Sequence, residues 1–346
     1  MNRLFSFGAV AALAAGLALA GAVAASRDQI RIVGSSTVFP FSAAAAEEFG
    51  RMTKHKTPVV ESTGSGGGLK LFCAGIAIED PDIANSSRRI KPSEIESCVA
   101  NGVTEITEVK IGFDGIVLAN SKATPQLSFS LAQIFLALAK RVPDGTGGLI
   151  DNPYELWSEI DPALPDAAIE VLGPPPTSGT RDAFVELAME GGCMGFPEIA
   201  ALKATDKNAF KAVCHSIRED GAFVEAGEND NLIVQKLETN ANALGIFGFS
   251  FLDQNLDRMQ SSLIEGVTPE FETVADGSYP ISRSMYFYVK NAHLGAVPGI
   301  EEFVRVFTEE SVWGKDGLLM DLGLIPLPDD ERAAVRESAR AFRPLE

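Results

Sequence analysis

The stretch QIRIVGSSTVFP (Gln29–Pro40) carries the pattern that decides the fold. Gln29–Val33 predicts a short strand, and it runs directly into the hydroxyl-rich turn Gly34–Thr37. Pro40 is typical of the first turn of a helix, and an Ala-rich helix is expected to end near Phe49 and Gly50. A strand therefore ends in a Ser/Thr turn that opens a helix.

Two further segments show the same order of strand, turn and helix. A strand near Thr57–Glu61 precedes TGSGGG (Thr63–Gly68), and a strand at Ile169–Leu172 precedes GPPPTSGTR (Gly173–Arg181). Thr63–Gly68 lacks the Gly-Lys-[Ser/Thr] ending of nucleotide triphosphate loops, which excludes that class of protein. The chain thus has three Ser/Thr/Gly turns, each placed between a strand and a helix.

These three turns together indicate an anion site. The start of a helix leaves backbone N–H groups unpaired and carries partial positive charge, while Ser and Thr hydroxyls add donors. In open α/β sheets ligands bind at the carboxyl ends of strands, so turns Ser35–Val38, Thr63–Gly67 and Thr177–Arg181 could converge on one small anion. A single turn of this kind is more often an ordinary helix cap or loop.

Three charged residues lie near these turns. Arg88, which follows the strand Asp82–Asn85, and Arg181 could each fork two oxygens of an anion, or could pair with a neighbouring carboxylate such as Asp182. Asp114 is close to two glycines; it could accept a hydrogen bond from a protonated oxyanion or orient an arginine.

The order of elements predicts an α/β fold with mostly parallel sheets flanked by helices. At 346 residues the chain has the length of two α/β lobes. Thr107–Leu118 is expected to be a long strand that crosses between the lobes, and Tyr279–Val289 a second crossing.

Charge and metal-ligand patterns exclude several classes of partner. The net charge of −18 opposes binding to nucleic acid and to anionic membranes, so hydrogen-bond donors must hold any anion against the protein's own field. The three histidines are scattered and no CxxC or HxxxH spacing occurs, so neither a metal nor another cofactor is expected.

The N-terminus predicts export. An apolar run, Leu4–Ala25, follows Arg3 and predicts a signal peptide over residues 1–25, cleaved before Ser26 or after Ala24. An uncleaved membrane anchor is the alternative, but the run is rich in Ala and lacks a flanking basic cluster. A periplasmic location is therefore expected.

Four cysteines in an oxidising compartment suggest two disulfides. Pairing neighbours along the chain gives Cys73–Cys98 and Cys193–Cys214, although three connectivities are formally open.

The chain resembles the periplasmic phosphate-binding proteins of bacterial ABC transporters over nearly its whole length after the signal peptide. The order and spacing of seven motifs carry this resemblance. They are IVGSSTVFPF (Ile32–Phe41), STGSGGG (Ser62–Gly68), DIANSSR (Asp82–Arg88), FDGIVL (Phe113–Leu118), TSGTRDAF (Thr177–Phe184), GIFGF (Gly245–Phe249) and GLIPLP (Gly323–Pro328).

The resemblance implies a two-lobed, hinged periplasmic binding protein, type II-like and monomeric, that closes on inorganic phosphate and presents it to a membrane permease. Residues 26–112 and 285–346 would form lobe I, and residues 113–284 lobe II. Carried over by position, the donors would be Ser36, Thr37 and Val38 from the first turn, Ser65 from the second, and Ser178, Gly179 and Thr180 from the third.

The chain departs from the well-known form of this family at two positions. Ser87, followed by Arg88, stands where that form has an aspartate that accepts the proton of hydrogen phosphate, and Pro174 stands where it has an arginine. Arg181 is the expected replacement for the arginine, as in SSR/SGTR-type relatives, and Asp114 is the candidate proton acceptor.

Three other functions compete with phosphate transport. A protein for sulfate, molybdate or arsenate would use the same fold and donors, and a phosphate sensor would use the same closure. A periplasmic phosphoesterase or Ser hydrolase is disfavoured, because no His adjoins a Ser/Gly turn and no GxSxG elbow follows a strand. Non-covalent capture, not catalysis, is therefore expected.

Overall fold

The structure is a computed structural model, and it describes residues 27–227 and 230–345. The expected signal peptide, residues 1–25, lies outside the described residues. Within the described ranges no helix has both the length and the apolar character that crossing a membrane requires.

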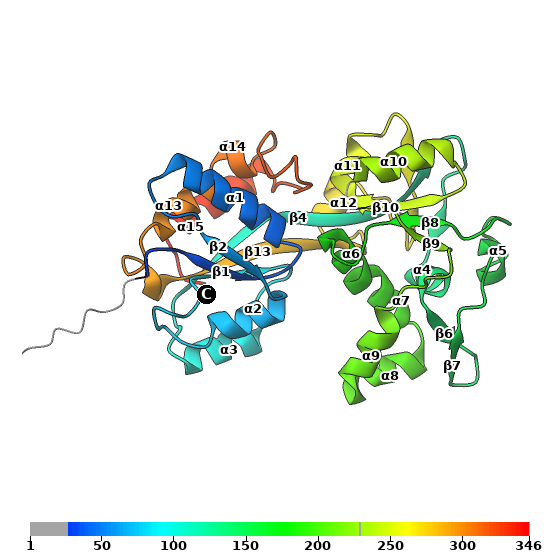
Figure 1. The fold of residues 1–346 in the computed structure, drawn as a ribbon, viewed down its shortest axis with the longest axis horizontal. Coiled ribbons are helices and arrows are strands. Elements are labelled where there is room, and N and C mark those ends of the chain that lie inside the picture. Colours follow the sequence, from blue (N-terminus) through cyan, green and yellow to red (C-terminus); the bar gives the residue numbers. More distant parts are fainter. Residues whose placement is uncertain (1–26, 228–229, 346) are drawn as a thin grey trace, which may run out of the picture.

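Two lobes lie side by side, joined by two long strands (Figure 1). In the lobe that holds the described N-terminus, β1 (Arg31–Gly34) lies between β2 (Val59–Ser62) and β3 (Ile83–Ser86), and all three strands are parallel. The carboxyl ends of these strands therefore meet at one edge of the sheet. The helices of this lobe are α1 (Phe39–Met52), α2 (Ser65–Phe72), α3 (Pro92–Ala100), the 3₁₀ turn η2 (Asn291–His293), α13 (Ile300–Phe307), α14 (Glu310–Trp313) and α15 (Asp329–Arg340).

The connecting strands are β4 (Ile106–Ser121) and β13 (Ser282–Lys290), which pair antiparallel. β13 also pairs with β3, and β4 pairs with β10 (Leu244–Gly248) in the other lobe. The sheet therefore runs continuously through both lobes in the order β2-β1-β3-β13-β4-β10-β8-β9. Only these two long strands need to bend for the lobes to move against each other.

In the second lobe β10, β8 (Val171–Gly173) and β9 (Phe223–Glu225) are parallel, and β11 (Met259–Ser261) adds to β4. Two small sheets lie outside this order: β5 (Ser128–Phe129) with β12 (Leu263–Ile264), and β6 (Arg141–Pro143) with β7 (Leu149–Asp151). The helices are α4 (Leu131–Leu138), α5 (Trp157–Ile160), α6 (Gly179–Phe184), the π-helix η1 (Val185–Met189), α7 (Glu190–Cys193), α8 (Pro197–Thr205), α9 (Lys207–Cys214), α10 (Asp230–Thr239), α11 (Phe249–Asp253) and α12 (Phe271–Ala275).

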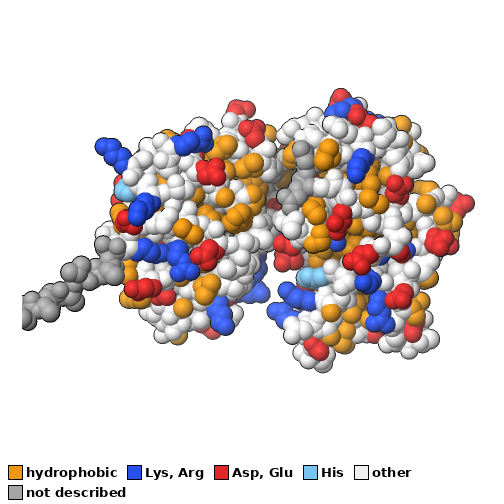
Figure 2. Space-filling view, in the orientation of Figure 1, with side chains coloured by type: hydrophobic (Ala, Val, Ile, Leu, Met, Phe, Trp, Pro, Cys, Tyr) orange, Lys and Arg blue, Asp and Glu red, His pale blue; other side chains and the backbone are white. Residues whose placement is uncertain are grey.

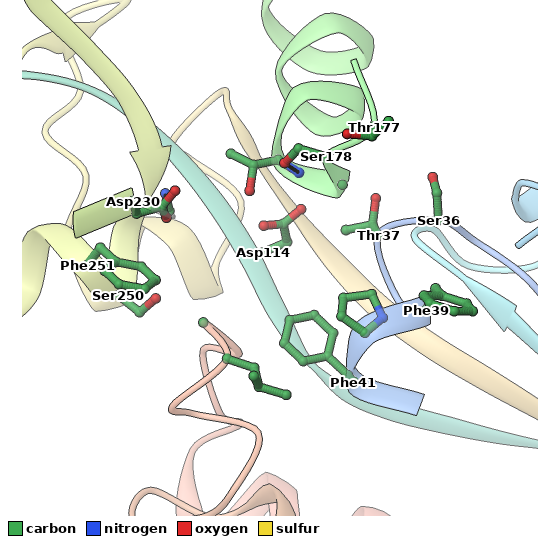
Figure 3. A pocket seen from close by; sticks show the side chains of 16 residues that line it. Ser36, Thr37, Phe39, Phe41, Asp114, Thr177, Ser178, Asp230, Ser250 and Phe251 are labelled. Atoms are coloured by element: carbon green, nitrogen blue, oxygen red, sulfur yellow. Dashed lines mark hydrogen bonds between the residues drawn. The ribbon is translucent and has the colours of Figure 1, made fainter. Parts of the chain in front are cut away.

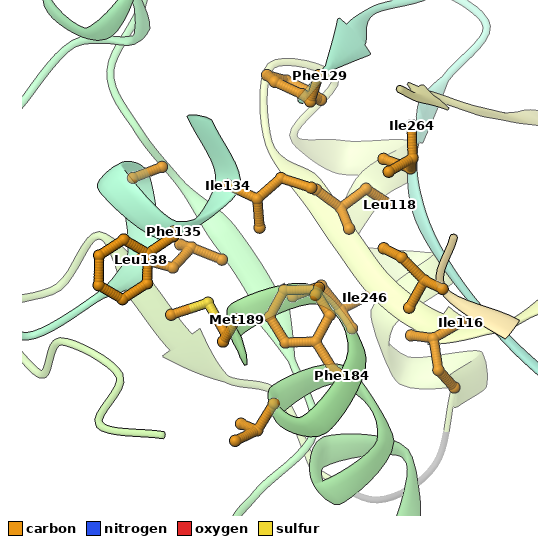
Figure 4. Close-up of a cluster of buried hydrophobic side chains, with 14 of the residues drawn as sticks. Ile116, Leu118, Phe129, Ile134, Phe135, Leu138, Phe184, Met189, Ile246 and Ile264 are labelled. Atoms are coloured by element: carbon orange, nitrogen blue, oxygen red, sulfur yellow. The ribbon is translucent and has the colours of Figure 1, made fainter. Parts of the chain in front are cut away.

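Each lobe has its own hydrophobic core. Phe135, Phe184, Met189 and Ile246 are fully buried in the core of the second lobe (Figure 4). In the first lobe α1 and α13 cover the sheet, and Phe49 packs edge-on against Phe303. Separate cores let each lobe behave as a rigid body.

Both disulfides form as the pairing of sequence neighbours suggested. Cys73–Cys98 joins the end of α2 to α3, and Cys193–Cys214 joins α7 to α9. Each bond lies within one lobe, so neither restrains motion between the lobes.

The predicted α/β two-lobed fold with two crossing strands is confirmed. The strand pairs within each lobe's β-α repeats are parallel, whereas the crossing strands are antiparallel because the chain leaves along β4 and returns along β13. The first crossing extends beyond the expected Thr107–Leu118 at both ends. The exact lobe boundaries stay a prediction.

Candidate functional site

A cavity of about 360 Å³ lies between the lobes (Figure 3). It is bounded by the start of α1, by β4, by the turn before α6, by the turn from β10 into α11 and by the loop that ends at Gly323. The space-filling view shows the two lobes as separate masses with a groove between them (Figure 2). The cavity thus takes residues from both lobes and from a crossing strand.

The first turn reaches the cavity because of Gly34. A Cβ on Gly34 would lie 2.1 Å from the Asn85 carbonyl oxygen, and the backbone has φ +133°, so only glycine fits here. The chain then turns, and Ser36 and Thr37 line the cavity. Val38 does not: its side chain is fully buried in the core, and its N–H donates to Ser35 Oγ at 3.3 Å.

The third turn meets the first across the groove. Ser178 caps α6 by accepting a hydrogen bond from the Thr180 N–H, and Ser178, Gly179 and Thr180 line the cavity. A Cβ on Gly179 would lie 3.3 Å from Thr37 Cα, which shows how closely the two backbones approach. Ser36 Oγ donates to Asp182 Oδ2 at 2.6 Å, so a hydrogen bond already spans the lobes.

Asp114 lines the cavity between these turns, and Arg283 holds it from the other crossing strand. The two residues face each other in the β4–β13 register, with Arg283 Nε 3.3 Å from Asp114 Oδ2. Arg283 also donates to Glu186 Oε2 at 2.7 Å and to Thr37 Oγ1, and its side chain is only 8% exposed. Burial raises the pKa of Asp114, and the Arg283 guanidinium opposes that rise.

The opposite end of the cavity holds two oxygen-bearing side chains that sequence reasoning missed, Asp230 at the start of α10 and Ser250 in α11. Among the described residues, Asp230 accepts a hydrogen bond from the Gly248 N–H at 3.3 Å, and burial raises the pKa of Asp230 to about 6. Ser250 Oγ is buried and has no hydrogen-bond partner among the described residues. Asp230 opens α10, and no local sequence pattern points its side chain toward a ligand.

Ser65 and Ser87 do not line the cavity. They lie just beyond β2 and β3, the strands on either side of β1, and bond to each other. Their hydroxyl oxygens are 3.0 Å apart, and the Ser87 N–H donates to Ser65 Oγ at 3.1 Å. The second turn is therefore at the same sheet edge as the first, with its hydroxyl already engaged.

Neither predicted arginine lines the cavity. Arg88 forks Glu94 through two hydrogen bonds of 2.8 and 2.7 Å, and this pairing raises the pKa of Arg88. Arg181 donates to the Pro174 carbonyl at 3.0 Å and lies over the Phe223 ring. The arginine nearest the cavity is instead Arg283, which lies within a strand where no turn motif marks it.

The cavity is suited to non-covalent capture. Neutral hydroxyls and helix starts line one end, where Asp114 also lies, and Asp230 and Ser250 line the other. Of the described lining residues, none is Lys, Arg or His. No cluster of His, Cys, Asp and Glu able to hold a metal occurs among the residues the structure describes.

Comparison with known proteins agrees with this geometry. Protein SphX of Synechococcus elongatus is 28% identical over 96% of this chain and 87% of its own length. Phosphate-binding protein PstS of Staphylococcus saprophyticus is 28% identical over 85% of this chain and 79% of its own length.

A solved structure of a possible phosphate-binding protein from Planctomyces limnophilus superposes with a TM-score of 0.71 at 26% identity, covering 91% of this chain and 98% of that one. The family model described as the PBP superfamily domain matches residues 20–311. With most of its length matched by that model, the chain belongs to the PBP superfamily.

Proposed function

We propose that this chain is an exported periplasmic binding protein that captures inorganic phosphate and delivers it to an ABC transporter permease. The observation that carries the proposal is the meeting of the first and third turns, from different lobes, at one cavity. PstS of Staphylococcus saprophyticus, which bears the name phosphate-binding protein, supports phosphate as the ligand.

Capture would rely on neutral donors. The hydroxyls of Ser36, Thr37, Ser178 and Thr180 and the N–H groups at the start of α6 face the cavity region, where a helix start favours negative charge. Arg283, one layer behind Thr37 and Asp114, would compensate part of the anion's charge. This arrangement fits a chain whose net charge is −18, since no long-range field attracts an anion.

Asp114 would accept the proton of hydrogen phosphate. It stands on the cavity floor, and as a carboxylate it can only accept hydrogen bonds. Sulfate carries no proton at neutral pH, so it could not donate a hydrogen bond that offsets its repulsion from the Asp114 carboxylate. Arsenate shares the protonation of phosphate and would not be rejected on this ground.

A smaller role in holding the ligand is left for four predicted residues, Ser65, Ser87, Arg88 and Arg181. Ser65 and Ser87 could donate only if the bond between them were exchanged for one to the ligand. The Arg88 and Arg181 side chains would have to leave Glu94 and Pro174. Val38 could contribute only through its backbone N–H, which would have to leave Ser35 Oγ, because its side chain belongs to the core.

Calorimetric titration of the purified protein with phosphate, arsenate, sulfate and molybdate tests the proposal. We expect one phosphate per chain and sulfate binding at least a hundredfold weaker. Equal or tighter binding of sulfate would contradict the assignment of Asp114, and Asp114→Asn should then leave phosphate affinity unchanged. Turnover of a generic phosphoester by the same preparation would contradict a pure binding role.

A further inference from the structure

The cavity offers more room than a tetrahedral oxyanion fills. Its volume of about 360 Å³ corresponds to roughly twelve water molecules at about 30 Å³ each, whereas phosphate has five heavy atoms. The Ser36–Asp182 bond and the close approach of Gly179 to Thr37 already bring the first and third turns together. The space is present even with these two turns in contact, and its volume lies in the size range of small-molecule sites.

The remaining space has an apolar wall. Phe39 and Phe41 from α1, Phe251 from α11 and Leu322 from the C-terminal loop line it (Figure 3). Phe39 and Leu322 are partly exposed, at 36% and 46%. An inorganic anion gains nothing from such side chains, whereas a short carbon chain placed against them would be removed from water.

Asp230 and Ser250 form a pair of hydrogen-bonding oxygens at the end of this wall. A Cβ on Gly248 would lie 3.8 Å from Asp230 Oδ2 and 3.7 Å from Ser250 Oγ, so both oxygens border the same backbone position. Asp230 is 8% exposed and Ser250 is 7% exposed. One ligand group could therefore contact both.

The two carboxylates of the cavity differ in how their charge is balanced. Asp114 is paired with Arg283, whereas no Lys, Arg or His among the described residues is paired with Asp230. Burial raises the pKa of Asp230 only to about 6, so the carboxylate is largely ionised at neutral pH. A buried carboxylate without a cation is costly unless a partner arrives with the ligand.

We infer that Asp230 and Ser250 form a second subsite, which takes the ammonium group of a short organophosphorus zwitterion whose tetrahedral head occupies the donor end. The carbon chain would lie along Phe41 and Phe251, and the aromatic faces would also favour the cation. The inference rests on the proposed anion site for the head group, and it extends the ligands beyond inorganic phosphate.

The experiment compares two ligands that differ only in the terminal group, 2-aminoethylphosphonate and propylphosphonate, with inorganic phosphate as reference. Calorimetry is done on the wild type, Asp230→Asn and Ser250→Ala. Asp253→Asn is the matched control, because Asp253 ends the same helix as Ser250 and faces solvent. Thermal melting checks that each variant is folded.

We expect the wild type and Asp253→Asn to bind 2-aminoethylphosphonate at least tenfold more tightly than propylphosphonate. Asp230→Asn should reduce this ratio to threefold or less, and Ser250→Ala should reduce it by a smaller factor. Equal binding of the two phosphonates by the wild type, or a ratio unaffected by Asp230→Asn, would overturn the inference.

Titration with inorganic phosphate distinguishes a failure of the second subsite from a failure of the proposed function. If phosphate binds and neither phosphonate does, the second subsite is refuted and the proposed function stands. If 2-aminoethylphosphonate binds with the expected dependence on Asp230 while phosphate does not, the subsite stands and phosphate capture is refuted. If no ligand binds, both are refuted.

Discussion

The two ends of the interlobe cavity differ in their hydrogen-bonding groups. At one end Ser36, Thr37 and the turn before α6 present donors from two helix starts, and the Ser36–Asp182 hydrogen bond already joins the two lobes there. At the other end Asp230 and Ser250 present oxygens whose bonding is incomplete among the described residues. The donor end can supply affinity for any tetrahedral anion, whereas the acceptor end can supply selectivity at a cost in stability.

Removing Arg283, which stands behind the donor end, should have the largest effect. Arg283→Met leaves the partly buried Asp114 without its cation and frees Thr37, so we expect the free energy of unfolding to fall by about 3 kcal/mol. Phosphate binding should fall with it. Urea denaturation measures the free energy of unfolding, and calorimetry measures phosphate binding. A variant as stable as the wild type would contradict the view that Asp114 needs Arg283 to balance its charge.

Neutralising the acceptor end should stabilise the protein. The pKa of Asp230 is raised to about 6 in the folded state, so the folded state binds this proton more tightly than the unfolded state. The free energy of unfolding therefore falls as pH rises from about 4 to 6, and the full penalty is present at pH 7. Two pKa units correspond to about 3 kcal/mol, an upper bound for the gain in Asp230→Asn at pH 7.

Denaturation of Asp230→Asn and the wild type at pH 4 and pH 7 checks this expectation. The gain should be present at pH 7 and should be much smaller near pH 4, where the carboxyl is protonated in the folded state and about half protonated in the unfolded state. A gain of the same size at both values would point to packing and not to the charge.

At the donor end, loss of one hydroxyl should weaken binding without affecting stability. Thr180→Ala removes a side chain that lines the cavity, and a hydrogen bond to a charged ligand contributes about 1–3 kcal/mol. We therefore expect phosphate to bind roughly 5- to 150-fold more weakly in titration calorimetry. Thr180→Ser retains the hydroxyl and should recover most of the affinity.

The second turn should show the smallest effect. Ser65 already bonds to Ser87, so Ser65→Ala removes a hydrogen bond within the protein and not one to the ligand. It should therefore weaken phosphate binding by less than about 1 kcal/mol. A loss as large as that of Thr180→Ala would show that the ligand-bound protein recruits Ser65. The same titration series decides between these results.

Local patterns predicted much of the fold and one end of the site. The strand–turn–helix order placed Ser36, Thr37 and Ser178–Thr180, and the Gly-flanked strand placed Asp114, because those positions depend only on their own neighbours. Arg283 was not predicted, because its place beside Asp114 depends on the register between β13 and β4 and not on its own neighbours in sequence. Asp230 and Ser250 meet because α10 and β10 are adjacent in the fold, which no short segment encodes.

The two predicted arginines lie close to the turns in sequence, yet neither lines the cavity. Arg88 and Arg181 lie beside the turns along the chain, but closeness in sequence does not fix the direction of a long side chain. Glu94 at the start of α3 and the Pro174 carbonyl offer each arginine a partner within seven residues. A partner so close in sequence orders the arginine side chain at little cost in entropy, so it competes well with a ligand for the guanidinium group.

The Ser36–Asp182 hydrogen bond implies that the protein carries its own competitor for the ligand. A bound anion would take the Ser36 hydroxyl from a carboxylate that already holds it, so binding exchanges one acceptor for another. The apparent affinity then falls in proportion to the fraction of molecules in which Ser36 is free. The protein therefore binds the anion more weakly than the same donors would if the Ser36 hydroxyl had no internal acceptor.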